Sequence, residues 1–256
     1  MTPGEPPREQ ALVFGEVAEQ YDAARPSYPE ELFATVIEHG RLRPGDAALE
    51  IGAGTGKATM GFVAHGLAVH ALEPSAGMAR VLRAKGVPVD VTRFEEWPIR
   101  ARAFRLVFAA QAWHWVQGAD RYDRVAEALE PGGTLALFWN MGRAHPEPFK
   151  TDNDAAYERL APEMIDSAGD KWTAEVLLGD IAACGAFEPM VEHKVTWRTS
   201  YTSGEWMRLL GTHSNHRMLP DDTRTRLHTE IGAVIDAHGG LLPVVYDTLV
   251  YLATRR

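Results

Sequence analysis

The segment 50–56 combines an acid with three glycines in a pattern that suits the binding of a small ligand. An apolar run at 47–51 is followed by the letters GAGTG, and a helix is expected from about Lys57. Glycine lacks a Cβ and adopts positive φ angles, so it lets a ligand approach the main chain closely. The first turn of the following helix offers free backbone N–H groups. The segment therefore predicts a ligand-binding turn, although by itself it also fits an ordinary glycine-rich turn.

The spacing of these glycines argues against a nicotinamide dinucleotide as the ligand. The dinucleotide fingerprint is Gly-x-Gly-x-x-Gly. With Gly52 and Gly54 in its first two positions, the third position falls on Lys57. Starting the fingerprint at Gly54 fails as well, because Thr59 then stands in the third position. A nicotinamide-dependent oxidoreductase is therefore disfavoured.

A second acid, Glu73, stands directly after the next apolar run, 67–72. A carboxylate at the end of such a strand can accept hydrogen bonds from both hydroxyls of a ribose, as in dinucleotide-binding folds. Acids at strand ends also cap helices or remain solvated. Because Glu73 accompanies the acid and glycines at 50–56, we favour the ribose interpretation.

Short apolar runs alternate with helical patterns from about 12 to 122, which is typical of parallel strands joined by crossover helices. The expected strands are 47–51, 67–72, 87–91, 105–110 and 134–139, and the expected helices begin near 57 and span 75–84 and 121–129. After 140 the pattern changes, with helices expected at 152–160, 173–183, 203–210 and 222–237 and strands at 191–197 and 244–252. These elements predict a mostly parallel sheet with helices on both faces, closed by an antiparallel pair, with the late helices as a lid over the strand ends.

The composition narrows the class of partner. The 256 residues include 26 Lys and Arg against 35 Asp and Glu, a net charge of −9, whereas proteins that bind polyanions usually carry an excess of positive charge. We therefore expect no nucleic acid and no membrane among the partners. The single cysteine, Cys184, cannot form an intrachain disulfide, and we recognise neither a secretory signal nor an apolar run of membrane-spanning length. The expectation is a soluble, cytoplasmic protein.

The segment 50–56, Glu-x-Gly-x-Gly-x-Gly, resembles motif I of the class I S-adenosylmethionine-dependent methyltransferases. Residues 130–133, EPGG, match the turn before the fifth strand of that family, and 19–29, EQYDAARPSYP, are similar to a stretch in its small-molecule branch, which includes trans-aconitate methyltransferase-like enzymes. The resemblance implies an α/β fold: a Rossmann-like, doubly wound, mostly parallel seven-stranded sheet with an antiparallel last strand and a helical lid. It implies one domain, with N-terminal helices over the cofactor (1–45), a cofactor-binding core (46–140), a helical lid with one core strand (141–240) and a closing strand (241–256).

The resemblance also implies S-adenosylmethionine as the cofactor and a set of residues around it. Glu73 would hold the ribose, the segment from Phe94 the adenine, and the end of the fourth strand the methionine part. The N-terminal arm would fold over the cofactor, with Tyr21 and Arg25 near its carboxylate. The expected cofactor-binding residues are Tyr21, Arg25, Glu50, Gly52, Ala53, Gly54, Thr55, Gly56, Glu73, Pro74, Met78, Phe94, Glu95, Ala110 and Gln111.

The implied reaction is an in-line displacement, in which the protein aligns donor and acceptor and excludes water. A carboxylate acceptor is ionised at pH 7 and needs no general base, and Arg25, Arg217 or Lys150 would then bind it. A hydroxyl or amine acceptor would need a base, for which His114 and His213 are the catalytic candidates. The expected substrate-binding residues are Tyr28, Trp113, Trp115, Asn140, His213, His216 and Arg217.

Several alternatives accompany these assignments. Trp113 and Trp115 are also typical of a hydrophobic core, and the residues around 213–216 lack the third ligand of a metal site, so no metal is expected. A nucleic-acid methyltransferase is disfavoured by the net charge and by QAWH at 111–114, where base-amino methylases carry Asn/Asp-Pro-Pro-aromatic. The main alternative is a catalytically silent S-adenosylmethionine-binding protein. We expect a monomer or a weak homodimer.

Overall fold

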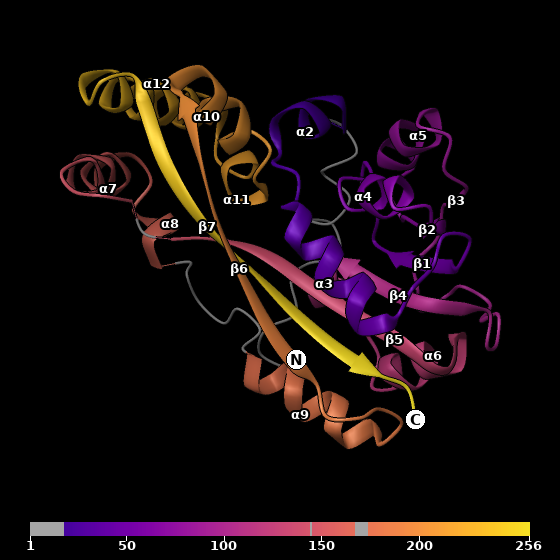
Figure 1. The fold of residues 1–256 in the computed structure, drawn as a ribbon. Coiled ribbons are helices and arrows are strands. Elements are labelled where there is room, and N and C mark those ends of the chain that lie inside the picture. The colour runs from indigo at the N-terminus through magenta and orange to yellow at the C-terminus, as the bar shows by residue number, and fades with distance from the viewer. Residues whose placement is uncertain (1–17, 144, 167–173) are drawn as a thin grey trace.

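A seven-stranded sheet in the order β3-β2-β1-β4-β5-β7-β6 forms the centre of the computed structural model (Figure 1). The structure describes residues 18–143, 145–166 and 174–256, so the first ten residues and the expected helix start at Thr173 lie outside it. The strands are β1 (Ala47–Ile51), β2 (Ala68–Leu72), β3 (Val89–Asp90), β4 (Phe104–Ala110), β5 (Leu129–Gly142), β6 (Val191–Thr202) and β7 (Leu241–Thr254). β1 to β5 pair in parallel, and β7 is antiparallel to both β5 and β6. The expected mostly parallel sheet with an antiparallel last strand is confirmed.

The helices begin close to the positions that the sequence predicts. They are α2 (Ala18–Ala24), α3 (Glu30–Gly40), α4 (Thr59–Ala64), α5 (Ala76–Ala84), α6 (Arg121–Ala128), α7 (Phe149–Leu160), α8 (Glu163–Asp166), α9 (Ala174–Cys184), α10 (Ser203–Leu210), α11 (Ser214–Arg217) and α12 (Asp221–Ala237), with a short 3-10 turn η2 (Trp113–Trp115). The start of α5 is capped by Ser75, whose Oγ accepts the Met78 N–H. The start of α10 is a capping box formed by Thr202 and Glu205.

Alternate residues of β4 point to opposite faces of the sheet, as the period of a strand requires. Leu106 and Phe108 pack with α3 and α4 on one face, and Val107 and Ala109 pack with α6 and α9 on the other. The helical side chains of the first face include Leu32, Phe33, Val36 and Phe62, and those of the second include Tyr122, Val125 and Ile181. Each face therefore has its own hydrophobic core.

The last two strands are longer than the sequence predicts, and β3 is shorter. The pairing of β6 with β7 runs without interruption from Val191–Leu252 to Thr202–Leu241, so the far halves of both strands leave the sheet as a two-stranded ribbon (Figure 1). The sequence does not predict this extension, because the mainly polar residues 198–202 lack a clear apolar pattern. They belong to a strand whose side chains are only partly buried. β3 ends at Asp90, whose carboxylate accepts the Trp97 indole N–H as the chain turns away.

The helices after residue 142 divide into two groups. α7, α10 and α12 pack around the ribbon in one hydrophobic cluster with Trp206, Leu227 and Ile231. α9 instead covers the sheet beside α6, where Arg121 Nη2 donates to Asp180 Oδ2 at 2.5 Å. The segment expected to form the lid thus supplies one helix of the core and a cluster on the ribbon. We call this cluster the ribbon cluster: α7, α10 and α12, with the short helix α11 joined to it through His216.

Candidate active site

The strand order reverses between β1 and β4, and open α/β sheets bind their ligands at such a point, in the crevice outside the carboxyl ends of the strands. The glycine turn, residues 52–56, follows β1 at this crevice and is held by Leu72 O, which accepts the N–H groups of Gly52 and Ala53 at 2.9 and 3.0 Å. A Cβ added to Gly52 would lie 2.6 Å from the Cβ of Ala112, just past β4. Glycine at this position therefore lets the loops after β1 and β4 touch.

Gly54 has a different reason to be glycine. Its φ is +57°, and in the described part of the chain a Cβ added to it would meet no atom within 4 Å other than those of its two neighbours in the sequence. Its N–H donates to Glu73 Oε2 at 2.8 Å. The turn thus presents its backbone to open space, with a carboxylate directly beside it.

Glu73 is fixed at the end of β2 by two backbone N–H groups. Oε2 accepts from Gly54, and Oε1 accepts from Ser75 at 2.8 Å. The residue is only 6% exposed, and this burial raises the pKa of Glu73, against the effect of the two N–H donors. Pro74 and Met78, also expected near the cofactor, lie before and within the first turn of α5.

Glu50, the acid of the motif, is buried in β1. Its Oε2 accepts the hydroxyl of Thr59, and its Oε1 has no hydrogen-bond partner among the described residues. Burial raises the pKa of Glu50 to about 8, and the neighbouring Glu73 adds to the shift. At pH 7 the group is therefore mostly a neutral acid with one unused oxygen.

The segment after β3 is tied to the sheet by its side chains. Phe94 is buried below Arg124, whose Nη2 donates to Phe94 O at 2.9 Å and whose guanidinium carbon lies 5.4 Å from the Phe94 ring centre. Glu95 Oε1 accepts the N–H of Gln117 at 2.5 Å. The ring of Phe94, expected near the adenine, thus belongs to the hydrophobic core.

The residues after β4 differ in how deeply their side chains are buried. Ala110 ends β4, and Gln111 follows with a φ of +56°, which is uncommon for a residue other than glycine. Trp113 is 1% exposed, and its indole N–H donates to the Tyr122 hydroxyl at 3.0 Å, so it lies in the core rather than at a substrate surface. Trp115 is less buried, with its ring centre 5.1 Å from that of His114.

His114 is neutral and oriented by a tryptophan. Trp139 Nε1 lies 3.3 Å from His114 Nδ1 and, as an indole N–H, can only donate. His114 therefore accepts at Nδ1 and carries its proton on Nε2. Burial lowers the pKa of His114 to about 4, so the imidazole is neutral at pH 7 and its Nε2–H is a hydrogen-bond donor.

The N-terminal arm reaches both sides of the crevice. Arg25 donates from Nε to Thr212 Oγ1 at 2.9 Å and from Nη2 to Thr212 O at 3.2 Å, and its guanidinium carbon lies 5.0 Å from the Tyr21 ring centre. Tyr28 packs edge-on against Phe138, with ring centres 5.0 Å apart, and burial raises its pKa. Thr212 was not among the predicted site residues, because nothing in its local sequence marks a partner so distant along the chain.

The two predicted histidines after α10 differ in their surroundings. His216 is buried, with Nε2 3.1 Å from the Tyr157 hydroxyl and Nδ1 3.1 Å from His228 Nε2. Burial lowers the pKa of His216 to about 3, and His228 adds to the shift. Burial also lowers the pKa of His213, with Arg25 the next contributor. Both imidazoles are therefore neutral at pH 7.

The remaining predicted residues lie on the two flanks of this region. Asn140 Oδ1 accepts the Thr248 hydroxyl at 2.6 Å. Arg217 ends the short helix α11. Lys150 is paired with Asp154 on α7 at 2.6 Å, so its ammonium is already engaged on the surface of the ribbon cluster.

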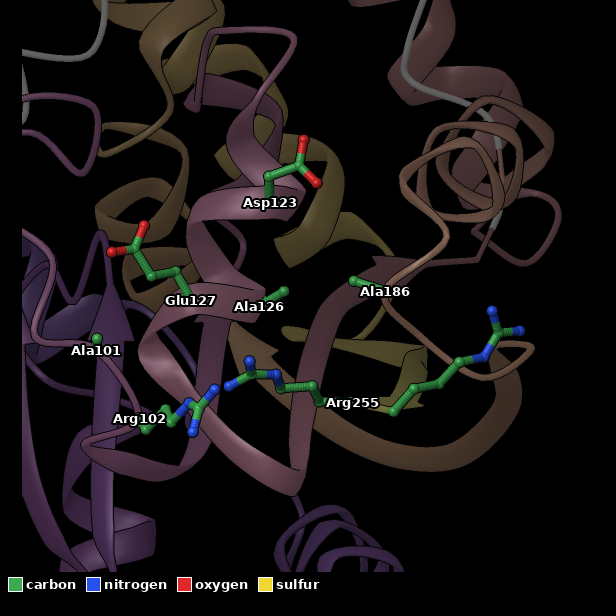
Figure 2. Close-up of a pocket in the computed structure, with 8 residues that line it drawn as sticks. Ala101, Arg102, Asp123, Ala126, Glu127, Ala186 and Arg255 are labelled. Atoms are coloured by element: carbon green, nitrogen blue, oxygen red, sulfur yellow. The ribbon is translucent and has the colours of Figure 1, made fainter.

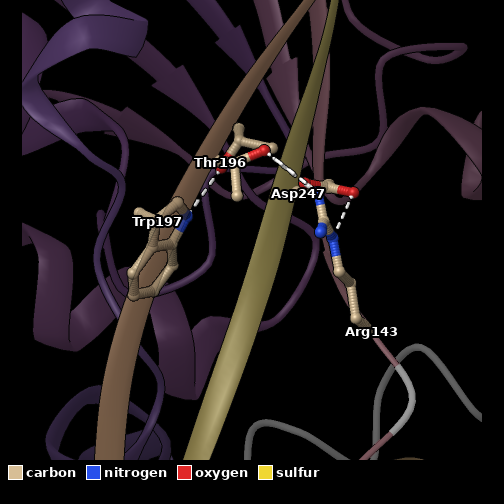
Figure 3. A network of polar contacts seen from close by, with 5 residues as sticks. Arg143, Thr196, Trp197 and Asp247 are labelled. Atoms are coloured by element: carbon tan, nitrogen blue, oxygen red, sulfur yellow. Dashed lines mark hydrogen bonds and ion pairs between the residues drawn. The ribbon is translucent and has the colours of Figure 1, made fainter.

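A second polar network braces the ribbon where it leaves the sheet. Figure 3 shows Arg143 against the carboxylate of Asp247, with Nε donating to Oδ2 at 2.8 Å and Nη2 to Oδ1 at 2.7 Å. Thr196 donates to the same carboxylate at 2.6 Å. Beside it, Trp197 donates to Thr248, which continues to Asn140. The network links β5, β6 and β7 and so fixes Asn140 at the end of the crevice.

A separate cavity of about 490 Å³ lies at the other end of the parallel strands, away from the glycine turn. Figure 2 shows it between the loop before β4, helix α6 and the residues after β7, with the head groups of Arg102 and Arg255 near one another. The amino ends of the parallel strands lie here, whereas α/β sheets bind their ligands at the carboxyl ends.

In the described part of the chain, no group of three or more His, Cys, Asp or Glu residues is placed to hold a metal ion. No helix there is long and apolar enough to cross a bilayer.

Comparison with known proteins identifies the family. A family model described as a methyltransferase domain matches residues 48–133. An uncharacterized methyltransferase of Mycobacterium tuberculosis is 31% identical over 255 residues, which cover 96% of this chain and 97% of the relative. The chain therefore belongs to the methyltransferase family. With its sheet order and its glycine turn, it is a class I S-adenosylmethionine-dependent methyltransferase, as motif I predicts.

Solved structures confirm the fold. Phosphoethanolamine N-methyltransferase 2 of Haemonchus contortus, in complex with phosphomonomethylethanolamine and S-adenosylhomocysteine, has a TM-score of 0.58 and 16% identity, covering 94% of this chain and 57% of that one. The [4+2]-cyclase SpnF has a TM-score of 0.57 and 17% identity, covering 99% of this chain and 97% of that one. Likeness at this level shows the fold alone.

Proposed function

We propose that the protein transfers the methyl group of S-adenosylmethionine to a small molecule that carries a carboxylate. The observation that carries the assignment of the methyl donor is the bond from Gly54 N–H to Glu73 Oε2. It places a carboxylate, which can accept hydrogen bonds from a ribose, beside the open, glycine-lined turn. The trans-aconitate methyltransferase-like stretch in the N-terminal arm supports an acceptor of this class.

The residues around the glycine turn fit S-adenosylmethionine. Gly54 leaves room beside the backbone, Glu73 accepts hydrogen bonds from the ribose hydroxyls, and the protonated carboxyl of Glu50 has a buried oxygen available for one further hydrogen bond. The backbone after Phe94 and the end of β4 complete the predicted donor site. When bound, S-adenosylmethionine supplies an activated methyl group on its sulfonium sulfur. The solved complex of the Haemonchus enzyme with S-adenosylhomocysteine supports this use of the fold.

Arg25 supports a carboxylate as the acceptor. Its guanidinium is partly buried and donates to the neutral groups of Thr212, and in the described part of the chain it forms no ion pair with a carboxylate. Burying such a cation without a counter-charge is costly, and a planar guanidinium suits a carboxylate ligand. The carboxylate of the cofactor, near which the resemblance places Arg25, or that of the acceptor can supply this charge. We assign it to the acceptor, and a lowered affinity of Arg25→Met for S-adenosylhomocysteine would assign it to the cofactor instead.

The histidines fit the same acceptor. His114 and His213 were the candidate general bases, but both have lowered pKa values, and the Nδ1 of His114 already accepts from Trp139. A base with a pKa near 4 removes a proton from a hydroxyl or amine poorly at pH 7. A carboxylate needs no such base, and the Nε2–H of His114 then acts as a donor that orients the acceptor.

The experiment is a screen of small carboxylic acids, each paired with its own primary amide, for release of S-adenosylhomocysteine. We expect turnover of acids and none of the matched amides, with the KM of the acid raised at least about tenfold in Arg25→Met and partly restored in Arg25→Lys. Equal turnover of acids and amides would contradict the carboxylate. Tight binding of S-adenosylhomocysteine without turnover of any acceptor would favour the catalytically silent alternative.

A further inference from the structure

Helix α2 is bonded through its C-terminal part to two different parts of the molecule. It lies between α5 on the donor side and α10 on the acceptor side (Figure 1). Asp22 pairs with Lys85 of the α5 end at 2.7 Å, and Arg25, just after α2, donates to Thr212 after α10. The seven-residue helix α2 therefore lies between the end of α5 beside the glycine turn and the end of α10 in the ribbon cluster.

On the donor side, Lys85 connects α2 to the glycine turn itself. Its Nζ donates to Asp22 Oδ1 at 2.7 Å and to Thr55 O at 2.9 Å. Both charged side chains are about three-quarters buried, at 27% and 26% exposed, so water screens the pair only partly. Burial alone would raise the pKa of Asp22, but the contacts with Lys85 and Thr55 and the charge of Lys57 hold it below its usual value. A displacement of Thr55 in the glycine turn therefore moves Lys85 and, through the pair with Asp22, helix α2.

On the acceptor side, Thr212 is equally constrained. It is 1% exposed, and its hydroxyl donates to Leu209 O at 2.7 Å in the last turn of α10 while accepting from Arg25 Nε. The next residue, His213, begins the segment with the predicted acceptor-binding residues. The position of Arg25 is thus transmitted through Thr212 to the start of α11.

We propose that α2 is a strap that couples the two sites, with Asp22, Lys85 and Thr212 as its positioning residues. Occupation of the glycine turn fixes Thr55 and Lys85, which hold α2, and α2 in turn orders the segment 203–217 through Arg25. This inference rests on the proposed function, in which the glycine turn binds the donor and 203–217 borders the acceptor. Because coupling between two binding sites is reciprocal, acceptor binding then tightens donor binding by the same factor.

The test is amide hydrogen exchange of the whole protein with and without saturating S-adenosylhomocysteine. In the wild type, the ligand should slow exchange at 52–56 and also at 203–217, the latter by about fivefold or more, the lower end of usual coupling factors. In Lys85→Met, the ligand should still protect 52–56 but change exchange at 203–217 by less than about twofold. Lys85→Arg should restore the distant protection, because it restores the charge.

A matched control is available on the same helix pair. Arg80 and Glu19 also join α5 to α2, at 3.2 Å, but their side chains are 68% and 75% exposed, so the pair contributes little. Arg80→Met should therefore keep the full response of 203–217. A second variant, Thr212→Val, removes the acceptor of the Arg25 Nε bond but keeps the backbone oxygen that accepts from Nη2, so it should clearly weaken the same response.

The outcomes separate the strap from the proposed function. If Lys85→Met and Thr212→Val respond at 203–217 as the wild type does, or if the wild type shows no response there, α2 does not couple the sites. If Lys85→Met does not fold or does not bind S-adenosylhomocysteine, the response of Thr212→Val decides. If the wild type itself fails to bind S-adenosylhomocysteine, the proposed donor site is wrong.

Discussion

The proposed donor side, at the glycine turn, and the proposed acceptor side, at the ribbon cluster, hold their polar groups by different means. Around the glycine turn, Glu73 is fixed by the backbone N–H groups of Gly54 and Ser75, close to it in the sequence or in the next loop. In the ribbon cluster, side chains hold side chains, as in the contacts of His216 with Tyr157 and His228. Backbone geometry is specified by a short motif, whereas a side-chain network depends on partners from several helices. The first side should therefore be sensitive to glycine and charge substitutions, and the second to pH and packing.

The largest effect is expected for Gly54→Val. The β-branched side chain would enter the open space beside the turn and would strain a backbone with a φ of +57°. Affinity for S-adenosylhomocysteine, measured by calorimetry, should fall by more than about a hundredfold, a cost of about 2.7 kcal/mol. Gly132→Val is the matched control, because Gly132 also has a positive φ, +73°, and open space but lies far from the crevice. If the control loses as much affinity, backbone strain rather than the site is the cause.

Glu73→Ala should have the next largest effect. It removes the charged acceptor proposed for the ribose, and a hydrogen bond to a charged group contributes about 1.5–3 kcal/mol. The dissociation constant of S-adenosylhomocysteine should rise about ten- to a hundredfold, with the far-ultraviolet circular dichroism unchanged. Glu130→Ala, which changes an acid at the start of β5 that lies 3.8 Å from Arg105, serves as the control. An unchanged dissociation constant in Glu73→Ala would remove this residue from the donor site.

The ribbon cluster should respond to acid. The pKa of His216 is about 3 in the folded protein and near 6.5 when unfolded, so the unfolded state binds more protons between these values. Stability is therefore highest above pH 6.5 and falls as the pH drops, by up to about 2 kcal/mol at pH 5 from this group. Denaturant unfolding of the wild type and His216→Phe should show a shallower pH slope in the variant. Equal slopes would mean that His216 is not the group that titrates.

The smallest effect is expected at the brace of the ribbon. Asp247→Asn removes a charge-assisted pair with Arg143 that is partly open to water, so the loss of stability should be about 1 kcal/mol. The contact with Arg143 holds the pKa of Asp247 at about 2, below its unfolded value. The stabilisation is therefore present above about pH 4 and is lost as the pH falls through 2. Asp247→Asn should remove this acid dependence and leave the affinity for S-adenosylhomocysteine unchanged.

The same contrast decides how much of the structure could be predicted from the sequence. The five parallel strands and the helices α5 and α6 follow from local periodicity and from caps such as Ser75, which are visible in a short window. The glycine turn and Glu73 lie together as predicted because both end neighbouring parallel strands. These features depend on residues close to one another in the chain or on a simple rule of sheet topology.

What the sequence did not predict depends on distant partners. The contacts of Thr212 and Lys85 depend on the position of α2 between α5 and α10, which the sequence does not indicate. Trp113 fitted a pocket wall as well as a core, and its buried bond to Tyr122 decides between them. The length of β6 was missed because its polar second half is a strand only through its pairing with β7. In each case the deciding contact is made by a segment whose position local patterns do not fix.

The place of β7 between β5 and β6 has a consequence for biosynthesis. Among the described strands, β6 pairs with β7 alone, and β7 is made later than β6. While the chain emerges from the ribosome, β1 to β5 can assemble first, but β6 must wait as a strand without its neighbour. An exposed strand of this kind is a template for pairing with other chains. The acceptor side therefore becomes native in one late step, and slow synthesis or premature termination between β6 and β7 should expose the nascent chain to aggregation and to chaperone capture.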